Sequence, residues 1–102
     1  MRSPYAVRML APTPREKLCD AQGRPYFLWD CDLTLDAFLQ KIALGGEERD
    51  YWLCTLLRQA KPDDALSLVT LDDIREAWPR ISSRLGKAEA FWSWRIRYGT
   101  AA

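Results

Sequence analysis

The chain has 102 residues with a hydrophobic content of 48%, which suits a single folded globular domain and is too short for two. Its 15 basic and 14 acidic residues give a net charge of +1, which argues against a strongly basic nucleic-acid binder. It has no histidine, the commonest general base, and its three cysteines are too few and too scattered for a disulfide framework or a zinc site.

The charges are unevenly distributed along the chain. Residues 1–24 carry five basic and two acidic groups, residues 25–74 carry four and ten, and residues 75–102 carry six and two, giving +3, −6 and +4. This pattern predicts either that the acidic middle packs near the basic ends, or that a basic end meets a polyanion or an acidic partner.

No membrane association and no cofactor are expected for this chain. No apolar run approaches the roughly 20 residues that a membrane span needs. The N-terminal residues also lack the apolar core of a signal peptide, so a cytoplasmic location is expected.

The chain is predicted to fold as a mainly α protein, a compact bundle of about four helices with an irregular N-terminal arm. Residues 1–24 form the arm, because they are rich in proline and show little periodicity apart from one short strand over residues 5–10. Residues 25–99 form the helical domain, and residues 100–102 form a tail.

Thr34 is predicted to cap the first helix, whose apolar residues recur at helical spacing until Gly45 and Gly46 end it. A second helix is expected over residues 47–60 and is closed by Pro62. Residues 63–69 should form a short helical turn or a connector.

Thr70 repeats the same signal, because a threonine again precedes Leu and Asp in a pattern like a capping box. The helix that follows should end or kink near Trp78, since Pro79 lies inside its pattern. A last helix is expected over residues 87–98, with Gly99 as its stop.

An aromatic run ending in Asp30 and Asp32, with Thr34 two residues further on, matches the nucleophile loop of haloacid-dehalogenase-type phosphatases. Such an enzyme needs a parallel sheet and further metal-binding carboxylates, for which 102 residues of helical pattern leave little room. The motif is therefore interpreted as structural, with Thr34 as a helix cap, and the protein is expected not to be an enzyme.

Phe27 and Leu28 of the aromatic run are predicted to be buried, whereas Tyr26 and Trp29 are candidates for a partner surface.

The last helix combines basic and aromatic residues. At 100° per residue its inner face is predicted to hold Ala88, Phe91, Trp92 and Ile96, with Arg95 in the middle. A charge there costs stability unless it is paired or its side chain extends to solvent, and Arg95 is predicted to pair with Asp30 or Asp32.

Trp94 and Tyr98 form a second aromatic edge, either buried on a second side of the last helix or exposed for a partner, with Arg84 and Lys87 at its rim. The alternative is a helix-turn-helix-like nucleic-acid binder that uses the basic side chains of Arg80, Arg84, Lys87 and Arg97. The helix is rich in tryptophan and poor in the Asn and Gln that read base edges, which favours protein binding.

The segment Arg24-Pro25-Tyr26-Phe27-Leu28-Trp29-Asp30-x-Asp32-Leu33-Thr34 resembles the start of a small bacterial domain family of unknown function. The resemblance extends over residues 24–98. Members of such families are often encoded beside abortive-infection toxins of the nucleotidyltransferase type. The resemblance implies an antitoxin-like or accessory role in a toxin–antitoxin or phage-defence system, and it brings no catalytic residues.

The sequence thus predicts a non-enzymatic helical protein that binds another protein, with the product of the adjacent gene as the first candidate. Its oligomeric state and its partner are not specified by these patterns.

Overall fold

The computed structural model describes residues 11–98, and it shows a mainly α fold in that range. The predicted short strand over residues 5–10 and the predicted stop at Gly99 lie outside the described residues. The elements in chain order are α1 (Arg15–Leu18), the 3₁₀ turn η1 (Tyr26–Leu28), α2 (Leu35–Ala43), α3 (Gly46–Gln59), α4 (Pro62–Leu68), α5 (Leu71–Ile81), the 3₁₀ turn η2 (Ser82–Arg84) and α6 (Ala88–Tyr98).

Both predicted threonine caps are confirmed. The Oγ1 of Thr34 accepts a hydrogen bond from the backbone N–H of Ala37 and begins α2. Thr70 begins α5 with a complete capping box, because Thr70 and Asp73 each accept a hydrogen bond from the other's backbone N–H. A threonine side chain therefore caps the N-terminus of both α2 and α5.

The boundary between α2 and α3 follows from two glycines. Gly45 and Gly46 have φ angles of +76° and +61°, which residues with a Cβ rarely adopt, so α2 stops at Ala43 and the chain turns into α3. Pro62, predicted to close α3, stands instead at the first position of α4, where a missing N–H costs nothing. The chain between Gln59 and Pro62 is therefore only a short connection.

The prediction that Pro79 ends or kinks the helix near Trp78 is wrong about the end, because α5 continues to Ile81. Pro79 is exposed and lies in the last turn, so only one intrahelical hydrogen bond is lost. Ile81 is fully buried and the N–H of Ser82 still donates to the carbonyl of Trp78. The burial of Ile81 therefore stabilises the last turn of α5 more than the hydrogen bond missing at Pro79 destabilises it.

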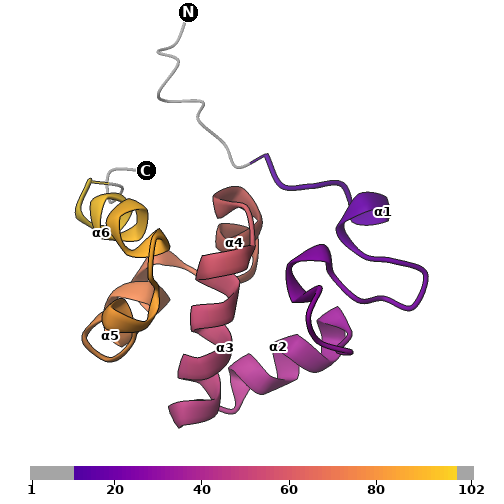
Figure 1. Cartoon of the computed structure of the whole chain (residues 1–102), viewed down its shortest axis with the longest axis horizontal. Helices are drawn as coiled ribbons and strands as arrows, with labels where there is room; N and C mark the ends of the chain where they lie inside the picture. Colours follow the sequence, from indigo (N-terminus) through magenta and orange to yellow (C-terminus); the bar gives the residue numbers. More distant parts are fainter. Residues whose placement is uncertain (1–10, 99–102) are drawn as a thin grey trace, which may run out of the picture.

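Helix α3 lies at the centre of the fold and packs against α2, α4, α5, α6 and η1 (Figure 1). The core around it is built from Phe27, Leu28, Leu35, Phe38, Leu53, Leu56, Leu57, Ile74, Ile81, Leu85 and Trp92. In Figure 1, α5 and α6 lie on one side of α3, and α1 lies on the other. The elements at the two ends of the described chain, α1 and α6, therefore lie on opposite sides of the central helix.

None of the helices in the described range is both long and apolar enough to cross a membrane.

Candidate functional site

Helix α6 is fixed to the domain along one face. Trp92 is almost completely buried, and its indole Nε1–H donates to the backbone carbonyl of Leu57 in α3 at 3.0 Å. At the other end of the helix, the guanidinium of Arg75 donates to the carbonyl of Ile96. The buried indole and this bound carbonyl determine which face of α6 turns outward.

The outward face of α6 carries three aromatic side chains in a row. Phe91, Trp94 and Tyr98 have exposed fractions of 39%, 56% and 63%. Their spacing of three and four residues aligns them, and successive ring centroids are 6.2 and 6.3 Å apart. We call these three residues the outer row. It corrects the prediction that Phe91 faces inward, because Trp92 and Ile96 fill the inner side and leave Phe91 at the edge.

The surroundings of the outer row are cationic. The guanidinium carbon of Arg97 lies 5.9 Å from the ring centroid of Tyr98. Lys87 comes one turn before Phe91, Arg84 belongs to the preceding η2, and both side chains are exposed. None of the ion pairs within residues 11–98 includes Arg84, Lys87 or Arg97, and Glu89, in the first turn, is the one acidic side chain of α6. The row therefore combines apolar rings with positive charge that is not paired within the described part of the chain.

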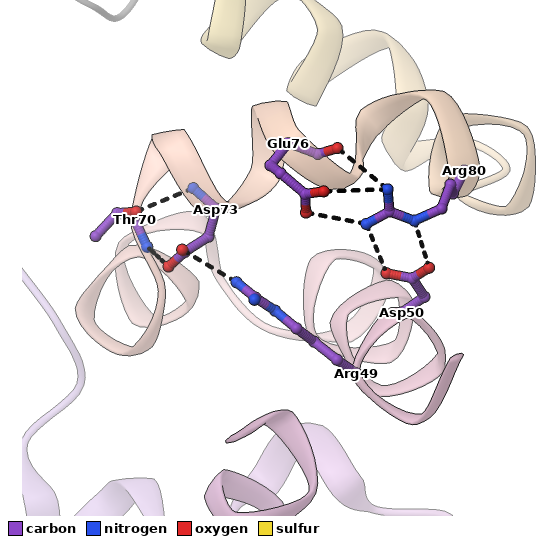
Figure 2. Close-up of polar contacts among 6 residues, drawn as sticks. All are labelled: Arg49, Asp50, Thr70, Asp73, Glu76 and Arg80. Carbon is purple, nitrogen blue, oxygen red and sulfur yellow. Dashed lines mark hydrogen bonds and ion pairs between the residues drawn. The ribbon is translucent and has the colours of Figure 1, made fainter. Parts of the chain in front are cut away.

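Arg80, one of the four cations of the nucleic-acid alternative, is engaged within the domain (Figure 2). Its Nε lies 2.7 Å from Oδ2 of Asp50, which is buried, and its Nη2 lies 2.9 Å from Oε1 of Glu76. The hydrogen bonds with Asp50 and Glu76 raise the pKa of the Arg80 guanidinium. Arg80 therefore links α5 to α3, and its donors are not free to bind a phosphate.

A second ion pair joins the same two helices. Arg49 Nη2 lies 3.0 Å from Oδ1 of Asp73, the residue that completes the capping box with Thr70 (Figure 2). The hydrogen bond from the Thr70 backbone N–H, helped by Arg49, lowers the pKa of Asp73. Arg49 and Asp73 both belong to the acidic segment 25–74. The ion pairs that join this segment to the basic ends are Arg24–Asp32, Arg75–Asp72 and Arg80–Asp50, as one of the two charge interpretations predicts.

The predicted pairing of Arg95 with Asp30 or Asp32 is not formed. Asp32 pairs instead with Arg24, whose Nη1 lies 3.0 Å from Oδ1, and the one side-chain contact of Asp30 among the described residues is a weak one from the thiol of Cys31. Within residues 11–98 Arg95 forms no ion pair, and its side chain is partly exposed. Asp32 has a cation only eight residues away in sequence, so it needs no contact with α6.

The aromatic run of residues 26–29 divides into inward and outward side chains. Phe27 and Leu28 are buried, as predicted, and the rings of Phe27 and Phe38 meet edge to face with centroids 5.4 Å apart. Trp29 has an exposed fraction of 75%. It therefore remains available to a partner, while its two neighbours hold η1 on the core.

Tyr26 is half-buried and has a role that the sequence patterns did not indicate. Its hydroxyl donates to Oδ2 of Asp64 at 2.5 Å and accepts from the backbone N–H of Lys61 at 2.8 Å. Asp64 also accepts from the N–H and the hydroxyl of Thr13, so it ties η1 and the arm to the start of α4. In the sequence, Asp64 stands in the first turn after Pro62. That position indicates the start of a helix and does not indicate contacts with Tyr26 or Thr13.

These contacts explain two pKa shifts. Burial and the hydrogen bond with Asp64 raise the pKa of Tyr26 to about 12. Burial alone would raise the pKa of Asp64, but the hydrogen bonds from Tyr26 and Thr13 outweigh it, and the pKa is lowered. The pair is therefore a neutral phenol bound to a carboxylate over the ordinary pH range.

Trp29 borders an open groove of about 450 Å³ between α1 and η1. Its lining includes Cys19 and Cys31, and burial raises the pKa of both thiols, so neither is poised as a thiolate nucleophile. In the described part of the chain no cluster of histidine, cysteine or carboxylate side chains could hold a metal ion. Because η1 and α6 lie on opposite sides of α3, the groove and the outer row are separate surfaces (Figure 1).

Comparison of the chain with protein-family models, with curated protein sequences and with solved structures found no match.

Proposed function

We propose that this chain is a non-enzymatic protein-binding module and that the outer row of α6 is its main contact surface. The observation that carries the proposal is the exposure of Phe91, Trp94 and Tyr98 side by side on one helix face. Aromatic residues exposed in this way bury large areas in complexes, and tryptophan and tyrosine are enriched among the residues that dominate binding energy. Arg84 and Lys87 form the basic rim of this surface.

Nucleic-acid binding through Arg84, Lys87 and Arg97 is the second candidate, because these three cations are exposed and form no ion pair with any residue from 11 to 98. Two observations weigh against it. Arg80 is already bound to Asp50 and Glu76. The rings of the outer row are also inclined to one another by 45° and 47°, so they form a continuous ridge and not the parallel platforms on which bases stack.

The more specific proposal is an antitoxin-like or accessory partner of a toxin or defence enzyme in the bacterial cytoplasm. It is supported by the motif resemblance over residues 24–98, and it makes the product of the adjacent gene the first partner to test.

The test is co-expression of the chain with that product, followed by size-exclusion chromatography with light scattering in moderate salt. We expect a stoichiometric complex that is lost when Trp94→Ala and Tyr98→Ala are combined. Tyr51→Ala is the matched control, because Tyr51 is an aromatic residue with 55% exposure on α3, outside the row. A complex that survives the double substitution would contradict the proposed surface.

The second candidate predicts a different pattern. If the free chain binds duplex or single-stranded DNA with a steep salt dependence, and if replacing Arg84, Lys87 and Arg97 abolishes this binding, nucleic acid would replace protein as the ligand.

A further inference from the structure

The shape of the outer row restricts what kind of element can cover it. Phe91 and Tyr98 are seven residues apart on α6, so the row is a ridge about 10 Å long, or two helical turns. Helix α6 satisfies its backbone hydrogen bonds internally except at its two ends, and it offers no free strand edge to an extended peptide. An element lying on this ridge must therefore satisfy its own backbone groups, which a helix does.

The charges around the ridge restrict the chemistry of that element. Lys87 precedes the row, Arg97 flanks Tyr98 at its other end, and Arg84 lies in the turn before α6. Glu89, in the first turn, is the one carboxylate of α6, and the three cations outnumber it. A partner with glutamate or aspartate on both sides of its apolar stripe would meet positive charge along the ridge.

The same charges disfavour a second copy of this chain as the occupant. A two-fold contact between two outer rows would bring the Lys87 and Arg97 side chains of both copies into one interface. Like charges placed opposite one another at an interface disfavour association.

We propose that the partner's docking element is an acidic amphipathic helix, which lies along α6 with its apolar stripe on Phe91, Trp94 and Tyr98. Its carboxylates face Lys87 and Arg97, with Arg84 contributing from η2. This inference rests on the proposed function of the outer row, and it adds the secondary structure and the charge of the partner.

The test uses the full chain labelled with ¹⁵N and three synthetic helical peptides of about 20 residues, long enough to hold helical structure. The first has a leucine stripe flanked by glutamate, the second has the same stripe flanked by lysine, and the third has glutamate with the stripe scrambled. The readout is the indole N–H signal of Trp94, assigned with Trp94→Phe and titrated at about 50 mM and 200 mM salt.

We expect the acidic striped peptide to shift the Trp94 signal and to bind at least about tenfold more tightly than the lysine peptide at the lower salt concentration. The difference should narrow at the higher salt concentration, because exposed charges are then screened. The scrambled peptide should leave the signal unchanged. Combining Lys87→Glu with Arg97→Glu should reverse the preference between the first two peptides, whereas Tyr51→Ala should leave it intact.

Four outcomes would overturn the inference, and they differ in what they mean for the proposed function. Equal binding of the acidic and lysine peptides at Trp94 would remove the charge requirement and leave the row as an apolar binding surface. No shift of Trp94 with any peptide would exclude an amphipathic helix as the occupant, and the complex with the adjacent gene product would then decide the proposed function separately. A Trp94 shift caused by an oligothymidine, or by raising the protein concentration alone, would replace the helix by nucleic acid or by a second copy.

Discussion

Arg75 holds the end of α6 by donating from both Nε and Nη2 to the carbonyl oxygen of Ile96, at distances of 3.1 and 3.0 Å. Ile96 lies in the last turn of α6, where carbonyls have no partner within the helix. Arg75 belongs to α5, and its Nη1 is 2.8 Å from Oδ1 of Asp72, which orients the guanidinium. The position of Tyr98 in the outer row therefore depends on a residue of another helix.

Replacing Arg75 with methionine should loosen the last turn of α6 without unfolding the domain. The loss of a charged donor to one carbonyl should reduce the free energy of unfolding by about 1–2 kcal/mol. Amide hydrogen exchange of residues 96–98 should accelerate more than that of α3. Exchange rates in α6 equal to those of the unchanged protein would contradict this role, and Arg75→Lys should give an intermediate result because it keeps a charge but loses the forked geometry.

The same substitution should affect stability strongly at one tryptophan of α6 and hardly at all at the other. Trp92→Phe removes a buried indole and its hydrogen bond to Leu57, so the free energy of unfolding should fall by about 2–4 kcal/mol. Trp94→Phe changes only an exposed side chain and should stay within about 0.5 kcal/mol of the unchanged protein. Urea unfolding followed by circular dichroism measures both, and similar losses at the two positions would show that the assigned faces of α6 are wrong.

The two threonine caps allow a matched comparison. Thr34→Ala removes one cap hydrogen bond and should cost about 1 kcal/mol. Thr70→Ala should cost more, because it also weakens the arrangement of Asp73, which binds Arg49 across the α3–α5 contact. Thermal unfolding of the two variants beside Thr34→Ser and Thr70→Ser tests this order. An equal or larger loss at Thr34 would mean that the capping box adds nothing to the simple cap.

Tyr26→Phe should reduce the free energy of unfolding by about 1–3 kcal/mol, because the backbone N–H of Lys61 loses its acceptor and Asp64 loses a donor. The measurement is chemical denaturation at pH 7, with Tyr51→Phe as a control at an exposed phenol.

The pH dependence of stability gives an independent check on the same pair. The raised pKa of Tyr26 contributes stability that is complete below pH 10 and is lost as the pH rises from about 10 to about 12. The lowered pKa of Asp64 contributes stability that is present above its usual pKa near 4 and is lost as the pH falls through its lower folded value. Tyr26→Phe should remove most of the alkaline component, and an unchanged alkaline slope would contradict the assignment.

The helices were predictable because their signals are local. Thr34 and Thr70 bond to backbone groups three residues away, and Gly45 and Gly46 need no distant contact to end a helix. The end of α5 was not predictable in the same way. A proline in the last turn of a helix destabilises it little when Ile81, two residues later, is buried, and burial depends on the whole fold.

The contacts between distant residues were less predictable. A lone charge on a helix face indicates that some partner is needed, but not which one. Of the two aspartates predicted for Arg95, Asp32 binds Arg24 and Asp30 is contacted by the thiol of Cys31. The partners of Asp64 lie 38 and 51 residues away in the chain, and no spacing rule connects them. In the candidate site, the alignment of Trp94 and Tyr98 followed from helical spacing, whereas the exposure of Phe91 depended on how Trp92 turns α6 against α3.

The central claim, that the outer row of α6 is the surface that binds a partner, is tested most directly by the indole N–H signals of the ¹⁵N-labelled chain when the adjacent gene product is added. We predict that the Trp94 signal shifts and becomes protected from solvent exchange, while the buried Trp92 signal stays in place. A complex in which Trp94 is unchanged and the signal of Trp29 shifts would contradict the claim and would place the contact at the groove beside η1.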